Sequence, residues 1–157
     1  MTYNEMVASL TTRMGGSLLR VVGQDTGEVD RVLTEAQEQV ADEMVAFHGS
    51  TYMPILDDEA DLEPRTNLYA ERVAISSSAS CLLHPCYHQA VVIGAARILS
   101  QKMGDANPKV KDGPRLDSQY AEALQRGHKV YALILNQNSV NRIVDGYAPD
   151  RHYEEVF

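Results

Sequence analysis

Apolar residues recur at helical spacing in four stretches of the chain, and this pattern predicts a mainly α protein. The clearest stretch spans residues 28–48, where apolar positions fall three or four residues apart and acidic residues occupy the other face. Gly49 is expected to end this helix, since glycine readily adopts the left-handed conformation that closes helices. Asp25 and Glu28 have the spacing of a capping box at its start.

A shorter helix is predicted at the N-terminus. Thr2 and Glu5 again have capping-box spacing, and Gly15 is expected to stop the helix after about three turns. The segment that follows, residues 17–23, is short and apolar, and it fits either a helical turn or a brief strand.

A third helix is predicted to begin at Pro85, because proline is well suited to the first position of a helix. Residues 90–99 are then apolar except at Gly94 and Arg97. A helix that is apolar on nearly all sides is buried on nearly all sides, so this one is expected at the centre of the fold.

A fourth helix is predicted from about Asp117 to Gln137. Its apolar stripe consists of Tyr120, Ala123, Leu124, Val130, Tyr131, Ile134 and Leu135. The remaining residues, 138–157, show no helical period and are interpreted as an extended C-terminal tail. The pattern thus predicts a single domain over residues 1–137, built as a bundle of about four helices.

Residues 50–83, between the second and third helices, follow no helical pattern. They contain two prolines, an acidic run, a serine cluster and one strand-like piece, residues 69–75. A loop of this length in a compact domain is usually functional or disordered. We therefore expect an extended arm or a hairpin.

Net charge argues against a protein that grips nucleic acid. The chain carries 22 acidic and 14 basic residues, a formal charge of −8, whereas phosphate binding needs clustered lysine and arginine. The sequence has no apolar run near 18 residues and no signal-peptide pattern at its start. With only two cysteines, Cys81 and Cys86, a reducing cytoplasm is the expected site of synthesis.

Two short motifs suggest chemistry. Residues 58–61 spell DEAD, the Mg²⁺-binding motif of a helicase family, but no phosphate-binding loop accompanies them, so a solvated acidic loop is the preferred interpretation. The segment CLLHPCYH offers zinc-ligand types, although the proline between them would make the side chains diverge; they are Cys81, His84, Cys86 and His88. Cys86 is also weighed as a nucleophile whose thiolate a helix N-terminus would stabilise. Neither motif yields a predicted catalytic residue, cofactor site or metal ligand.

The order of helices resembles a known family. The segments that carry the resemblance are DRVLTEAQEQVADEMVAFHGSTYMPIL, AVVIGAARILSQKMG and SQYAEALQRGHKVYAL. Together they are similar to the small helical head–tail connector, or adaptor, proteins of tailed bacteriophages, of the Mu-like type. The matching positions are Ala36, Ala41, Tyr52, Pro54, Ala95, Ala96, Arg97, Ile98, Leu99, Tyr120, Ala123 and Leu124. The resemblance covers roughly residues 2–56 and 83–135.

The resemblance implies a structural virion protein in the neck, made in the host bacterial cytoplasm. Such subunits form a ring, often of 12 copies, beneath the portal protein and join it to a head-closure or tail protein. DNA passes through the ring without specific binding, and no enzyme activity, cofactor or membrane is implied. The alternative is a small helical regulatory or binding module that acts through its C-terminal tail.

Two sets of contact residues follow from this expectation. Residues 28–48 carry a local charge of −5, and acidic walls repel DNA phosphates over about 10 Å in salt. We therefore expect Glu35, Glu38 and Asp42 to face the channel or a ring neighbour. The arm and the tail are expected to supply partner contacts, namely Tyr69, Arg72, Val73, Ile75, Arg142, Tyr147, Tyr153 and Phe157.

Overall fold

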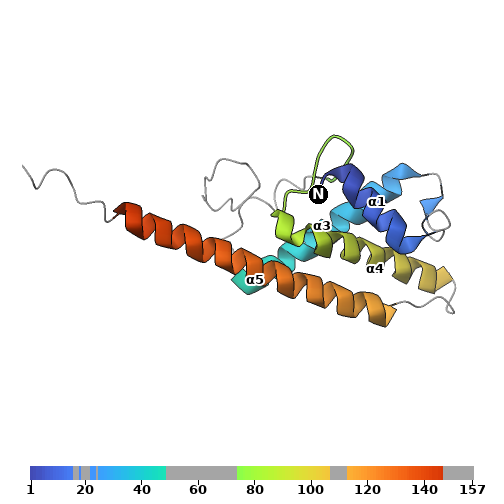
Figure 1. Ribbon diagram of the computed structural model, residues 1–157. Coiled ribbons are helices and arrows are strands. Elements are labelled where there is room, and N and C mark those ends of the chain that lie inside the picture. The colour runs from blue at the N-terminus through green and yellow to red at the C-terminus, as the bar shows by residue number, and fades with distance from the viewer. Residues whose placement is uncertain (16–17, 19–21, 24, 49–73, 107–112, 147–157) are drawn as a thin grey trace, which may run out of the picture.

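The computed structural model describes residues 1–15, 18, 22–23, 25–48, 74–106 and 113–146. Its described part contains four main helices and no strand (Figure 1). The helices are α1 (Tyr3–Met14), α3 (Thr26–His48), α4 (His88–Ala106) and α5 (Gly113–Gly146), and a short 3₁₀ helix, η2 (Pro85–Tyr87), precedes α4. The predicted mainly α bundle is confirmed.

Helix α4 is the centre of the packing. It contacts α1, α3 and α5, and every residue from 90 to 100 except Arg97 is buried. Burying each valine, leucine or isoleucine side chain contributes roughly 1.5–3 kcal/mol. This one helix therefore contributes a large share of the hydrophobic stabilisation, as its sequence predicts.

The capping residues behave differently at the starts of α1 and α3. At α1 the capping box forms as predicted: the Thr2 hydroxyl accepts from the Glu5 N–H, and the Glu5 carboxylate accepts from the Thr2 N–H. At α3, Asp25 accepts from the Gly27 N–H at 2.9 Å, but Glu28 does not complete the box. Its carboxylate instead binds Arg31 and Lys102, because two cations lie within its reach.

Residues 74–83 do not extend from the domain as the expected arm; they pack onto it. The Ile75 N–H donates to the Thr34 hydroxyl at 3.0 Å, and the Leu82 N–H donates to Gln37 Oε1 at 2.9 Å. The stretch also buries three apolar side chains, Ile75, Cys81 and Leu83. Side chains of α3 thus accept hydrogen bonds from the backbone of this irregular segment. The rest of the expected arm lies outside the described residues.

Helix α5 is longer than predicted at both ends. It begins at Gly113, before Asp117, since proline at position 114 is tolerated in a first turn. It continues to Gly146, so residues 138–146 are helical and not tail. In Figure 1 this end of α5 extends past the ends of α3 and α4. The predicted end relied on the apolar stripe, which stops near Gln137 where the sequence becomes polar.

Three helices converge at Gly94. A Cβ atom there would lie 3.2 Å from the Tyr120 ring of α5 and 3.3 Å from the Ala36 side chain of α3. The absence of a side chain lets the helices approach closely and fixes where Tyr120 lies. None of the described helices is long and apolar enough to span a lipid bilayer.

Candidate functional site

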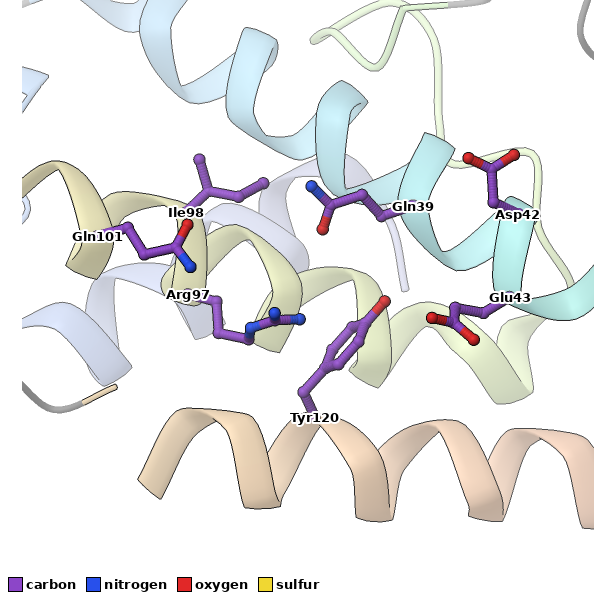
Figure 2. A pocket seen from close by; sticks show the side chains of 7 residues that line it. All are labelled: Gln39, Asp42, Glu43, Arg97, Ile98, Gln101 and Tyr120. Carbon is purple, nitrogen blue, oxygen red and sulfur yellow. The ribbon is translucent and has the colours of Figure 1, made fainter. Parts of the chain in front are cut away.

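A polar pocket lies where α3, α4 and α5 meet, beside the Gly94 crossing (Figure 2). Its volume of about 390 Å³ is within the range of small ligand sites. Two carboxylates, two amides, a guanidinium and a phenol line it, together with one apolar side chain. The lining residues are Gln39, Asp42, Glu43, Arg97, Ile98, Gln101 and Tyr120.

Tyr120 is the buried polar group of this pocket. The residue is only 7% exposed, and its hydroxyl has no hydrogen-bond partner within the described part of the chain. Figure 2 shows the hydroxyl directed from α5 toward α3, between Gln39 and Glu43. Burial, and next the negative charge of Glu43, raises the pKa of the phenol. The group therefore stays neutral at physiological pH and can both donate and accept a hydrogen bond.

Arg97 holds Tyr120 from the other side. Its guanidinium carbon lies 4.6 Å from the centroid of the Tyr120 ring, which is a cation–π distance. Its Nε lies 2.7 Å from Asp117 Oδ1, at ion-pair distance but without the geometry of a hydrogen bond. The one cation that lines the pocket is thus already matched by a carboxylate outside it.

The carboxylates of Asp42 and Glu43 have no hydrogen-bond or ion-pair partner in the part of the chain that the structure describes. Carboxylates only accept hydrogen bonds when ionised. With Arg97 matched by Asp117, the pocket presents an excess of negative charge and of acceptors. Its chemistry favours a cationic group that carries several N–H donors.

The predicted acidic face lies on one side of α3. Glu38 and Asp42 are exposed and Glu35 is half-buried, and their spacing places them on a face of the helix turned away from the core. Asp42 also lines the pocket. The structure therefore brings these three residues to one surface, and whether that surface faces a channel stays a prediction.

The predicted partner contacts are placed only in part. Ile75 is fully buried in the chain's own core, so it is not available to a partner, and its assignment as a contact is corrected. Its apolar side chain packs inward because the segment is tethered to Thr34. Arg142 belongs to α5. The remaining predicted contacts lie outside the described residues, namely Tyr69, Arg72, Val73, Tyr147, Tyr153 and Phe157, as does the DEAD string at 58–61.

The CLLHPCYH segment is packed, and burial lowers the reactivity of its thiols. Burial raises the pKa of Cys81 and of Cys86 to about 11, opposite to the lowered pKa of a nucleophilic cysteine. His84 Nδ1 accepts from the Cys86 N–H at 3.3 Å and caps η2. His88 Nε2 donates to the Leu83 carbonyl at 2.7 Å. Over the described residues, no three histidine, cysteine or acidic side chains are arranged to hold a metal ion.

Sequence reasoning missed a histidine–tyrosine cluster beneath this segment. The Tyr87 hydroxyl lies 3.0 Å from His48 Nε2 and 2.8 Å from His128 Nδ1. One nitrogen accepts the phenol proton and the other donates to the phenol oxygen, so the cluster is satisfied with both histidines neutral. Phe47 stacks on His128 with ring centroids 4.2 Å apart. The cluster joins the end of α3 to η2 and α5.

Most of the pocket was also missed from sequence, although Asp42 was singled out. Tyr120 was recognised as part of an apolar stripe and Arg97 as an interruption in a buried helix. Both also belong to the family resemblance, but neither was predicted to line a pocket. A tyrosine in a core stripe opposite an arginine in a buried helix is the available signal, because both carry polar ends that need partners.

Comparison of the chain with protein-family models, with curated proteins and with solved structures found no match.

Proposed function

We propose that this chain is a subunit of the head–tail connector of a tailed bacteriophage. In this role it is a structural protein of the virion neck, and copies form a ring beneath the portal protein. The ring links the DNA-filled head to a head-closure or tail protein. The observation that carries the proposal is the order and packing of the helices, a short capped helix, a long acidic helix, a buried central helix and a final helix.

The acidic outer face of α3 supports this role. Glu38 and Asp42 project into solvent, and the chain as a whole is strongly acidic. A conduit for DNA must not retain its cargo, and carboxylates repel phosphates within about a Debye length, roughly 10 Å. The proposal therefore turns this face toward the passing DNA or toward a neighbouring subunit.

The length of α5 supports an assembly role as well. At 34 residues the helix is about 51 Å long, using 1.5 Å per residue, and its C-terminal part extends past the other helices of the bundle (Figure 1). Isolated helix is only marginally stable without tertiary packing. In the proposal a portal or tail protein supplies the packing surface for this end.

The test is negative-stain imaging of the purified chain with and without a portal ring. The proposal expects an added layer of density on one face of the portal ring, with the symmetry of a ring. Portal imaged alone is the control. A chain that leaves the portal bare and remains a small oligomer would refute the connector role. That result would favour the helical regulatory or binding module.

A further inference from the structure

We propose that the pocket between α3, α4 and α5 receives the guanidinium group of Arg126 from a second copy of this chain. The inference rests on the proposed ring, and it names the contact between neighbouring subunits. It joins two surfaces of the described residues, the acidic pocket on one side of the molecule and the outer face of α5 on another.

Tyr120 indicates that the pocket is built to hold a polar group. A tyrosine that is 93% buried ordinarily finds a hydrogen-bond partner for its hydroxyl. This hydroxyl has none among the residues that the structure describes, and it is directed toward Gln39 and Glu43 (Figure 2). An unsatisfied buried group carries a desolvation penalty. A donor from outside that reaches this corner of the pocket removes the penalty.

The charges around Tyr120 identify the occupant as a cation. Asp42 and Glu43 have no partner among the described residues, while Arg97 is matched by Asp117. A guanidinium presents five N–H donors in a planar fork and binds carboxylates in pairs of parallel hydrogen bonds. It can therefore bind the Glu43 carboxylate through two parallel hydrogen bonds and lie beside the phenol of Tyr120, which an ammonium group does less well.

The outer face of α5 supplies such a group. Arg126 and Lys129 are exposed and have no ion-pair partner in the described part of the chain. Next to them, Val130 and Leu133 are apolar but 39% and 62% exposed. Exposed apolar side chains ringed by charge are typical of protein contact surfaces. This face therefore complements the pocket in both charge and composition.

Arg126 cannot fill the pocket of its own chain without leaving the face on which it lies. It is six residues from Tyr120, which places it about 120° further around the helix at 100° per residue. A contact between two different faces is heterologous, and repeating it generates either a ring or an open filament. The same geometry that excludes self-contact thus permits closure of a ring.

The experiment is a charge exchange followed by sedimentation velocity. One variant, D42K/E43K, has a basic pocket and a basic α5 face. The other, R126E/K129E, has an acidic pocket and an acidic α5 face. In each variant alone, the pocket and the α5 face carry charges of the same sign and repel each other. Self-association is therefore expected to weaken at least about tenfold. An equimolar mixture places opposite charges at every contact, and association is expected to return to the wild-type range.

Controls separate this contact from general effects. R13E changes the charge of α1 and is expected to associate like wild type, and circular dichroism checks that each variant is folded. Y120F keeps the charge and removes only the hydroxyl, so weaker association by Y120F supports the pocket itself. Unchanged association of both charge variants, or a mixture that fails to recover, overturns the inference.

A wild-type chain that stays monomeric at about 0.5 mM also overturns the inference, because a contact of millimolar Kd or tighter populates dimers there. These outcomes are distinct from failure of the connector role. A chain that joins the portal ring while its charge variants behave like wild type refutes only this contact. A chain that never joins the portal refutes the connector role itself.

Discussion

Two buried tyrosines show that the contribution of a hydroxyl group to the stability of the protein depends on its position. The Tyr87 hydroxyl forms hydrogen bonds with His48 and His128, whereas the Tyr120 hydroxyl has no partner among the residues described. Replacing Tyr120 by phenylalanine removes an unsatisfied polar atom, and we expect the free energy of unfolding to rise by about 1 kcal/mol. Tyr87→Phe should instead lower it by about 1–2 kcal/mol, because two histidine nitrogens lose their partner. Urea unfolding of both variants tests the contrast, and a loss of stability in Tyr120→Phe would contradict it.

At this scale the sequence predicts burial well and orientation poorly. The apolar stripe correctly placed Tyr120 and Tyr131 in the core, but Val130 of the same stripe is 39% exposed. Which way a phenol points depends on residues far away along the chain, here Glu43 and Arg97, and on the close approach that Gly94 permits. No local pattern records such contacts, so the pocket became evident only from the fold.

At the scale of elements, α5 approaches η2 closely at Gly127. A Cβ atom there would lie 2.7 Å from two ring carbons of Tyr87. We expect Gly127→Ala to destabilise the protein by about 1–3 kcal/mol through overpacking, despite the roughly 1 kcal/mol that alanine gains in a helix. In a Tyr87→Ala background the ring is gone, and the same substitution should become neutral or stabilising. Thermal unfolding of the wild type, the two single variants and the double variant measures this coupling. An equal effect of Gly127→Ala in both backgrounds would disprove the clash.

Helices with a clear apolar face could be predicted from the sequence. The end of α5 and the irregular segment at residues 74–83 could not. Periodicity located α3 and the central α4 because their apolar faces are buried. It ended α5 near Gln137, although the backbone stays helical to Gly146. It also missed the docking of residues 74–83, which depends on the side chains of Thr34 and Gln37, because hydrogen bonds from one element to another's backbone leave no periodic trace.

At the scale of the whole molecule, buried histidines make stability depend on pH. Burial lowers the pKa of four of them, namely His48, His84, His88 and His128. Neighbouring positive charge adds to this effect at His48 and His88, whereas Glu43 opposes it at His128. The unfolded chain therefore binds more protons than the folded chain as pH falls below about 6.5, the ordinary histidine pKa. Stability is full above that pH and is lost as the pH falls toward the lower folded pKa values.

Urea unfolding at pH 8, 6.5 and 5 measures this dependence, with histidine proton resonances as the direct readout of each pKa. The urea concentration at the unfolding midpoint is expected to decrease when the pH is lowered from 6.5 to 5. Glu28 does not contribute in that window, because its two cationic partners lower its pKa to about 2, so its stabilisation disappears only between about pH 4.5 and 2. A midpoint that rises toward pH 5 would contradict the burial of neutral histidines.

The function at this scale could be argued from the sequence only through its resemblance to head–tail connectors. The assembly itself is tested most directly by mass. Twelve copies of the 17.4-kDa chain add about 209 kDa to a portal ring. Mass photometry of the portal ring with excess chain is expected to show that single step, with few intermediate masses. A portal peak that does not shift, while the chain stays in its own low-mass peak, would contradict the account.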